Sequence, residues 1–173
     1  MARTKRLPPH EKAKRAVLRT LTSSRHAILR EARTLPPSKR EEVFLGTWSA
    51  RHLVAHLIGW DHTNSQAVAE VLRGKVPAFF RRYDHDWASY NASLVRRHNR
   101  GSFTNLLAEA ANSSDRLLVD LQQIPSSDFF QDRGLRAAGW KVTIARLLEA
   151  ETKDERRHAA QLRQFLRSRS RRR

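Results

Sequence analysis

The sequence contains no cysteine and only six glycines and six prolines among its 173 residues. The absence of cysteine excludes disulfide bonds and zinc sites built on thiolates. No apolar run approaches the roughly 20 residues that a membrane-spanning helix needs. The longest early run, Ala16-Val17-Leu18, is far shorter than the core of a signal peptide. We therefore expect a soluble, cytoplasmic protein that does not enter a membrane.

The sequence also lacks the short motifs of several large functional classes. It contains no glycine-rich phosphate loop, no nucleophile elbow, no zinc finger and no recognisable helix-turn-helix signature. No segment shows the convincing apolar–polar alternation of a strand, and no repeat of solenoid length is present. Helical periodicity is therefore the main structural signal.

Positive charge is in large excess and is concentrated at the two ends of the chain. The formal net charge is +17. Residues 1–30 carry nine Lys/Arg and one Glu, and residues 159–173 carry six Arg and no acid, whereas residues 101–140 carry three Arg and five acids. Such ends can bind phosphate backbones without sequence preference, but a merely solvating tail has the same composition. We expect a basic extension over residues 1–9 and a disordered Arg-rich tail over residues 167–173.

Between the glycines and prolines, apolar residues recur with the 3.6-residue period of amphipathic helices. The pattern predicts long helices over about residues 10–34, 50–73, 103–123 and 143–166. Residues 10–166 are therefore expected to form one domain. Its predicted fold is all-α, an up-and-down four-helix bundle with an extra short helix.

The extra helix is expected over about residues 84–99, between the second and third long helices. Residues 75–83, which precede it, have the composition of a loop. We expect this loop to expose Phe79 and Phe80.

The apolar stripe of the last long helix is interrupted by polar residues. At helical spacing the stripe continues through Glu151, Asp154, Glu155 and His158, with leucines on both sides. Burying such groups unpaired is costly. The interruption therefore predicts a pocket, a metal site or a satisfied polar network inside the bundle.

His56 lies on the apolar face of the second helix and can complete a set with Asp154 and His158, which are four residues apart on one face. Two imidazoles and one carboxylate suit zinc, nickel or iron with open positions for water or substrate. These three residues are our candidate metal ligands, and a hydrogen-bonded core triad without metal is the alternative. His52 follows the expected N-cap Ser49 within one turn, so it should face solvent or reach back to the cap.

Glu151 and Glu155 form a second candidate pair. They can act as general acid and base if burial raises the pKa of one of them. The simpler alternative is that both glutamates pair with Lys or Arg on a neighbouring helix.

Three aromatic residues are candidates for lining a substrate pocket: Trp60, Trp87 and Tyr90. Trp60 is one helical turn from His56, and Trp87 follows an acidic segment that can close the mouth of a cavity. Packing in the core is the alternative role for these side chains.

Several segments resemble known proteins. The second-helix signature of the DinB-like superfamily is similar to residues 48–61, WSARHLVAHLIGWD. Within that superfamily, residues 57–60, 86–91 and 124–125 resemble the ClbS/DfsB branch, and residues 143–161 are similar to the last helix of the family. The order and spacing of these segments carry the resemblance.

The resemblance implies a bundle with a central cavity. Many superfamily members hold a divalent metal through one histidine of the second helix and two of the last. His56 and His158 match two of these positions, and Asp154 stands where the remaining histidine is expected. The ClbS-type branch is associated with protection against a reactive DNA-damaging metabolite by cyclopropane hydrolysis, without an obvious three-histidine site. The resemblance therefore implies a small-molecule hydrolase or a detoxification protein, and other branches add thiol transfer to an electrophile.

Two further functions remain open from the sequence. The bundle can be a non-catalytic scaffold that holds DNA or RNA through its Arg-rich ends, or an inert bundle whose polar segment is fully paired. A homodimer is a further candidate assembly.

Overall fold

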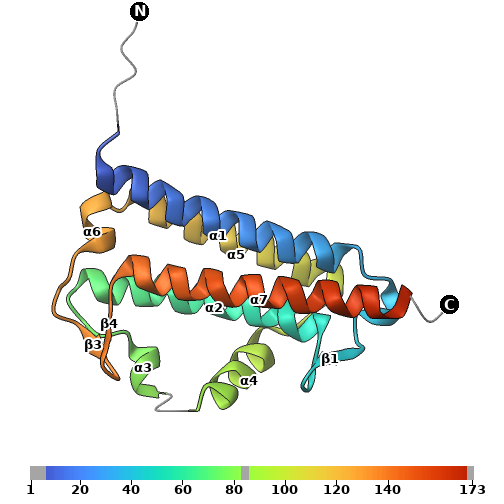
Figure 1. The fold of residues 1–173 in the computed structure, drawn as a ribbon. Coiled ribbons are helices and arrows are strands. Elements are labelled where there is room, and N and C mark those ends of the chain that lie inside the picture. The colour runs from blue at the N-terminus through green and yellow to red at the C-terminus, as the bar shows by residue number, and fades with distance from the viewer. Residues whose placement is uncertain (1–6, 83–85, 171–173) are drawn as a thin grey trace, which may run out of the picture.

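The computed structural model describes residues 7–82 and 86–170, and its long helices form a four-helix bundle (Figure 1). The bundle helices are α1 (Pro9–Arg33), α2 (Ala50–Leu72), α5 (Phe103–Gln123) and α7 (Ile144–Ser170). The expected all-α four-helix bundle is confirmed, with helix boundaries close to the predicted ones. The main difference is that α7 continues to Ser170, so the expected tail begins as helix, while residues 1–6 and 171–173 lie outside the described residues.

The chain reverses direction at each long helix, including the predicted extra one, α4 (Trp87–His98). The colour gradient in Figure 1 shows that α1 and α7 run one way and that α2 and α5 run the other. α4 packs across α2 and returns the chain to the end of the bundle at which α2 begins. The up-and-down alternation therefore includes α4, and it makes α2 and α5 parallel neighbours.

α4 packs closely on α2 because α2 has a glycine at the contact. A Cβ atom added to Gly59 would lie 2.7 Å from the Cβ of Leu94. Any larger residue would push α4 away from α2.

Two short antiparallel hairpins correct the expectation that the chain has no strands. β1 (Val43–Leu45) pairs with β2 (Trp48–Ser49), and β3 (Arg136–Ala137) pairs with β4 (Trp140–Lys141). Strands of two or three residues are too short to show alternation in the sequence. The turn of the second hairpin contains Ala138 and Gly139, both with positive φ (48° and 76°), as tight hairpin turns require.

The expected loop over residues 75–83 is also wrong, because it contains the short helix α3 (Ala78–Arg82). Phe79 is buried, with its ring centroid 5.7 Å from that of Trp60, and Phe80 is half-buried against Trp140. Tertiary packing therefore orders a segment whose local composition is that of a loop. The remaining short elements are a 3₁₀ turn, η1 (Pro37–Lys39), and α6 (Ser126–Phe130).

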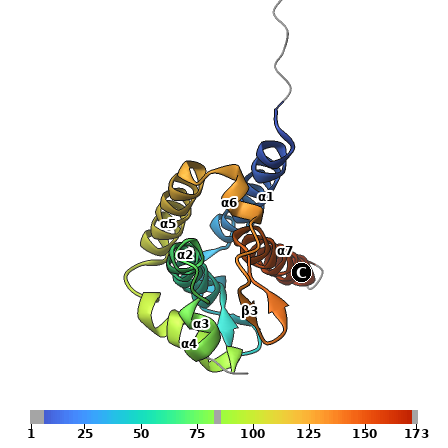
Figure 2. The ribbon, with the colours of Figure 1, turned by 90° about the vertical axis from the view of Figure 1, so that its left-hand side faces the viewer.

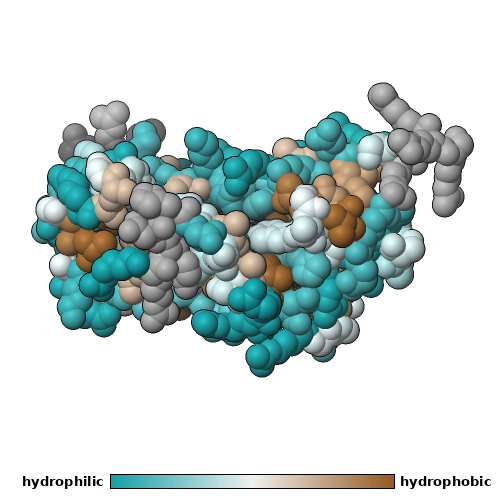
Figure 3. Space-filling view, turned by 90° about the horizontal axis from the view of Figure 1, so that it is seen from below, coloured by the Kyte–Doolittle hydropathy of each residue, from teal (hydrophilic) through white to brown (hydrophobic). Residues whose placement is uncertain are grey.

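The face that carries the two hairpins, α3 and α4 is mostly hydrophilic (Figure 3). Its hydrophobic residues lie in separate small groups among hydrophilic neighbours. Within the described ranges, no helix is both long and apolar enough to cross a membrane.

Candidate metal and small-molecule site

A polar layer crosses the bundle between two apolar clusters of the core. One cluster contains Ile28, Leu57 and Leu162, and the other contains Leu21 and Leu148. Every bundle helix contributes buried polar residues between them: Ser24 and Arg25 from α1, Asp61 and Asn64 from α2, Ser113 and Ser114 from α5, and Glu151, Thr152, Glu155 and His158 from α7. The polar interruption seen in the sequence of α7 is therefore the contribution of one helix to a layer that all four bundle helices build.

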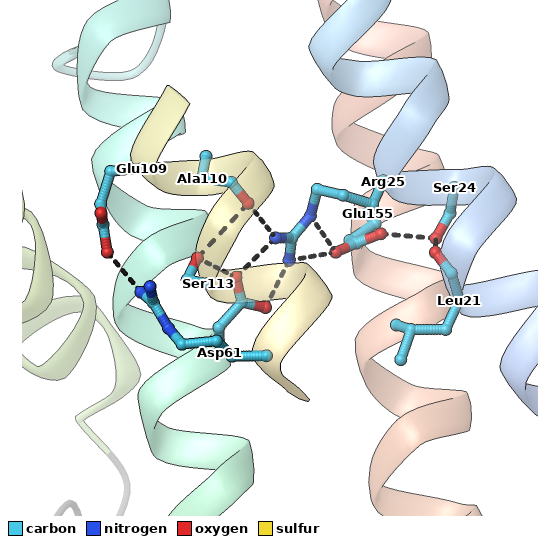
Figure 4. A network of polar contacts seen from close by, with 9 residues as sticks. Leu21, Ser24, Arg25, Asp61, Glu109, Ala110, Ser113 and Glu155 are labelled. Carbon is cyan, nitrogen blue, oxygen red and sulfur yellow. Dashed lines mark hydrogen bonds and ion pairs between the residues drawn. The ribbon is translucent and has the colours of Figure 1, made fainter. Parts of the chain in front are cut away.

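Arg25 is the centre of this layer, and Figure 4 shows its contacts with the three other helices. Its guanidinium donates two hydrogen bonds to Asp61, at 2.6 and 2.8 Å, and its Nε donates to Oε1 of Glu155 at 2.8 Å. Ser24 and Ser113 donate at 2.5 Å to the other oxygen of Glu155 and to Asp61. Two ion pairs thus compensate an otherwise costly buried cation, and the two serine hydroxyls donate to its carboxylate partners.

This network settles where Glu155 lies but leaves its predicted catalytic role untested. Both carboxylate oxygens of Glu155 are occupied, one by Arg25 and the other by Ser24. The alternative pairing with an arginine on a neighbouring helix is therefore what the structure shows for this glutamate. Sequence reasoning had not identified Arg25 or Asp61.

Glu151 differs from Glu155 because no described residue forms an ion pair or a hydrogen bond with its carboxyl group. The side chain is buried, with 8% of the residue exposed. Burial and the nearby Glu155 carboxylate raise the pKa of Glu151 well above its ordinary value, and attraction to Arg25 only partly offsets this. Glu151 thus holds a proton more readily than an ordinary glutamate, as suits a general acid.

The three predicted metal ligands are brought together beside the polar layer. Nε2 of His158 lies 3.0 Å from Oδ2 of Asp154, and Nε2 of His56 lies 3.7 Å from the same oxygen. One potential ligand atom from each residue lies within 4.8 Å of the other two. Ligands 2.0–2.1 Å from a tetrahedral zinc ion are separated from one another by about 3.3 Å. Two of the three spacings, 3.0 and 3.7 Å, are therefore close to the value that such an ion requires.

The protonation states of this cluster also suit a metal. Burial lowers the pKa of His56, with partial compensation from Asp154. Burial opposes ionisation of Asp154, but hydrogen bonds from His158 and His56 outweigh it and hold the pKa of this carboxyl well below its ordinary value. A neutral imidazole and an ionised carboxylate are the forms that bind metal. The side chain of Asp154 is 32% exposed, so the cluster opens to solvent on that side.

The outer nitrogens of the two histidines have different environments. Nδ1 of His158 lies 2.8 Å from Oε1 of Gln161, a contact that directs Nε2 towards Asp154. Nδ1 of His56 is buried without a hydrogen-bond partner in the part of the chain that the structure describes, and the ring packs 4.8 Å from Trp48. Gln161 and Trp48 therefore hold the two imidazole rings, and their sequence positions did not indicate this role.

The three aromatic residues predicted to line a pocket lie together. The ring of Trp60 is 5.4 Å from Tyr90 and 6.2 Å from both Trp87 and His56. Trp60 donates its indole N–H to Asn91 at 3.1 Å, and the Tyr90 hydroxyl lies 2.5 Å from Thr63. Tyr90 is buried, whereas Trp87 is 44% exposed. A series of ring contacts thus connects the exposed Trp87, through Trp60, to His56 of the cluster.

His52 has the structural role that its position predicts. Its Nδ1 accepts a hydrogen bond of 3.0 Å from the backbone N–H of Ser49, which closes a capping box at the start of α2. His52 therefore stays outside the metal-ligand set.

The fold and the cluster define a class of protein: a four-helix bundle with one histidine from its second helix and a carboxylate and a histidine from its last. Solved structures with this fold include the colibactin self-resistance protein ClbS in complex with double-stranded DNA. That chain matches with a TM-score of 0.72 at 16% identity, over 87% of this chain and 93% of its own. An uncharacterised protein from Escherichia coli UTI89 matches with a TM-score of 0.69 at 18% identity. The match covers 90% of this chain and 93% of that protein. The chain therefore has a ClbS-like fold.

No protein-family profile and no curated protein matches the sequence. The likeness to ClbS therefore establishes the architecture alone, and the function depends on the residues of this chain's own site.

Proposed function

We propose that this protein processes a reactive small-molecule electrophile in a pocket beside the polar layer, with a divalent metal held by His56, Asp154 and His158. The observation that carries the proposal is the convergence of their three ligand atoms within 4.8 Å. The ClbS-like fold supports a resistance or detoxification role, because the neighbour of known role is a self-resistance protein. Hydrolysis is the reaction that we favour, and thiol transfer to the same kind of electrophile is the alternative.

The residues have separate tasks in this proposal. A zinc, nickel or iron ion held by the cluster would supply a bound water of lowered pKa and a Lewis acid. Glu151 holds a proton that can be delivered to a leaving group, since its pKa is raised. Glu155 keeps α7 in register through Arg25. Trp60, Trp87 and Tyr90 exclude water and contact the apolar parts of a substrate.

The first test is metal stoichiometry. We expect the protein to bind about one equivalent of Zn²⁺ in equilibrium dialysis with elemental analysis. His56→Ala, Asp154→Ala and His158→Ala should each weaken zinc binding by more than about 100-fold, since loss of a direct ligand exceeds the 10–100-fold effect of outer-shell changes.

His62→Ala is the matched control, because His62 is an exposed histidine on α2 outside the cluster. It should bind zinc like the wild type. A substoichiometric content in the wild type, or equal losses in His62→Ala and the ligand variants, would contradict the metal-dependent form of the proposal.

Nucleic-acid binding is a second candidate function, and a specific observation favours it. The structural neighbour ClbS is in complex with double-stranded DNA. The present chain has a net charge of +17, concentrated towards its two ends. In this reading the basic ends hold a phosphate backbone, and binding weakens steeply with salt.

Removal of the ends tests this second function. A chain lacking residues 1–6 and 171–173 should bind duplex DNA more weakly in a fluorescence-anisotropy titration, because it loses six of its Lys/Arg residues. Zinc binding, measured in parallel, should be unchanged. Undiminished DNA binding would show that the ends are not the binding surface.

A further inference from the structure

We infer that the outer face of α7 is a binding surface for the phosphate backbone of double-stranded nucleic acid. The inference rests on the second candidate function and adds the surface that contacts the duplex. Among the positions of α7 whose burial is described, residues 144–168, the exposed ones contain six Lys/Arg and a single acid, Glu149. The six basic residues, hereafter the α7 basic face, are Arg146, Lys153, Arg156, Arg157, Arg163 and Arg167.

The α7 basic face is a stripe along the helix, with Glu149 inside it between Arg146 and Lys153. At 3.6 residues per turn its members fall within about 120° of the helix circumference. From Arg146 to Arg167 it extends about 32 Å at 1.5 Å per residue. One turn of duplex DNA is about 34 Å long. The stripe can therefore follow phosphates over nearly a full turn of a duplex.

Four of the six charges have neither an acidic partner nor an aromatic ring against them among the described residues. Lys153, Arg156 and Arg167 form no ion pair with any residue that the structure describes. Arg163 donates only to the backbone carbonyl of Ala159, at 3.1 Å, which leaves its charge uncompensated. α7 also lies at the edge of the bundle, so its outer side is accessible (Figure 2). These charges are free to attract an anionic partner.

The other two charges are held in place by neighbours. Arg157 pairs with Asp154, and the guanidinium of Arg146 lies 5.2 Å from the ring centroid of Trp140. Arg157 therefore joins the α7 basic face to the candidate metal site. A duplex on this face would lie next to the solvent-exposed side of Asp154.

The chemistry of the face favours a duplex over a single strand. Sites for single strands stack bases on aromatic side chains, and none of the exposed residues described between positions 144 and 168 is aromatic. Lysine and arginine contacts to phosphates position a duplex without reading its sequence. We therefore expect binding that depends strongly on salt and only weakly on base sequence.

The experiment compares two triple variants of the full chain. Lys153→Glu/Arg156→Glu/Arg163→Glu alters the α7 basic face, and Lys12→Glu/Arg19→Glu/Arg30→Glu alters exposed positions of α1. Each variant lowers the net charge by six, from +17 to +11. Affinity for a duplex of about 20 base pairs is measured by fluorescence anisotropy at several salt concentrations.

The α7 variant should bind at least about 10-fold more weakly and lose about three units of salt slope, at about 0.9 per phosphate contact. The α1 variant should stay within about threefold of the wild type, and circular dichroism should show all three proteins equally helical. Equal losses in both variants would overturn the inference, because net charge alone would then explain binding.

Two further outcomes are decisive. If the wild type does not bind duplex at low salt, the second candidate function fails and the inference fails with it. If the α7 variant loses binding to anionic phospholipid vesicles but not to duplex, the second function stands on another surface and the α7 basic face belongs to a membrane.

Discussion

Arg25→Met should destabilise the protein by about 3–5 kcal/mol, the range expected when one partner of a buried ion pair is removed. Arg25 is 2% exposed and contacts Asp61 and Glu155 from two other helices. Methionine fills much of the same volume but leaves two carboxylates buried beside each other. Each must then take up a proton or draw in water, and both changes oppose folding. Urea denaturation followed by circular dichroism measures the loss.

Two controls separate this mechanism from the loss of a large side chain. Arg96→Met, at an exposed position of α4, should change stability by less than about 0.5 kcal/mol. Adding Asp61→Leu and Glu155→Met to Arg25→Met should restore much of the stability, because an apolar layer leaves no buried charge unpaired. A loss below about 1 kcal/mol for Arg25→Met alone would mean that water already reaches the network.

The helices of the bundle were predictable because each long helix carries its own periodic signal. α5 was expected over residues 103–123 and is observed as Phe103–Gln123. Ser49 and His52 also predicted their capping geometry, since a cap depends on residues within one turn. The missed elements, α3 and the hairpins, are short, and tertiary contacts such as that of Phe79 with Trp60 hold them.

The candidate site was predicted in part, because some of its residues interrupt the apolar stripe of a single helix. The polar interruption of α7 identified Glu151, Asp154, Glu155 and His158, all of which face the bundle or its edge. Arg25 interrupts the stripe of α1 in the same way, between Leu21 and Ile28. One arginine in a stripe is hard to distinguish from a long side chain that reaches solvent. Comparison of the interruptions on all four helices would have located the layer.

The sequence could not reveal which glutamate would be paired. Glu151 and Glu155 are one turn apart on α7, and either could have faced α1. The structure places Glu155 opposite Ser24 and Arg25 and leaves Glu151 without a bonding partner among the described residues. Which glutamate faces Arg25 depends on how far α1 and α7 are shifted relative to each other along their axes. This shift is set by the packing between the helices. It separates the structural glutamate from the one suited to proton transfer.

Glu151→Gln should stabilise the protein, and the gain should grow as the pH rises. The pKa of Glu151 is raised in the folded state, mainly by burial. The folded protein therefore keeps a proton that the unfolded chain begins to lose near pH 4.5, the ordinary value for this group. The free energy of unfolding of the wild type therefore decreases as the pH rises above 4.5, and it stops decreasing for this reason once the pH exceeds the folded-state pKa of Glu151. Glutamine cannot ionise, so the variant lacks this decrease.

The measurement is the free energy of unfolding of both proteins between pH 4.5 and 9. Their difference cancels the groups that titrate independently of Glu151 and keeps Glu151 together with the neighbouring Glu155 carboxylate. Glu149→Gln, an exposed position on the same helix, is the matched control and should leave the pH dependence unchanged. Glu151→Gln should still bind zinc, because Glu151 is not one of the three ligands. If Glu151→Gln is instead less stable than the wild type at pH 8, the carboxylate is ionised and favourably paired in the folded protein. It then cannot be the proton donor, and the acid would have to come from solvent at the exposed side of Asp154.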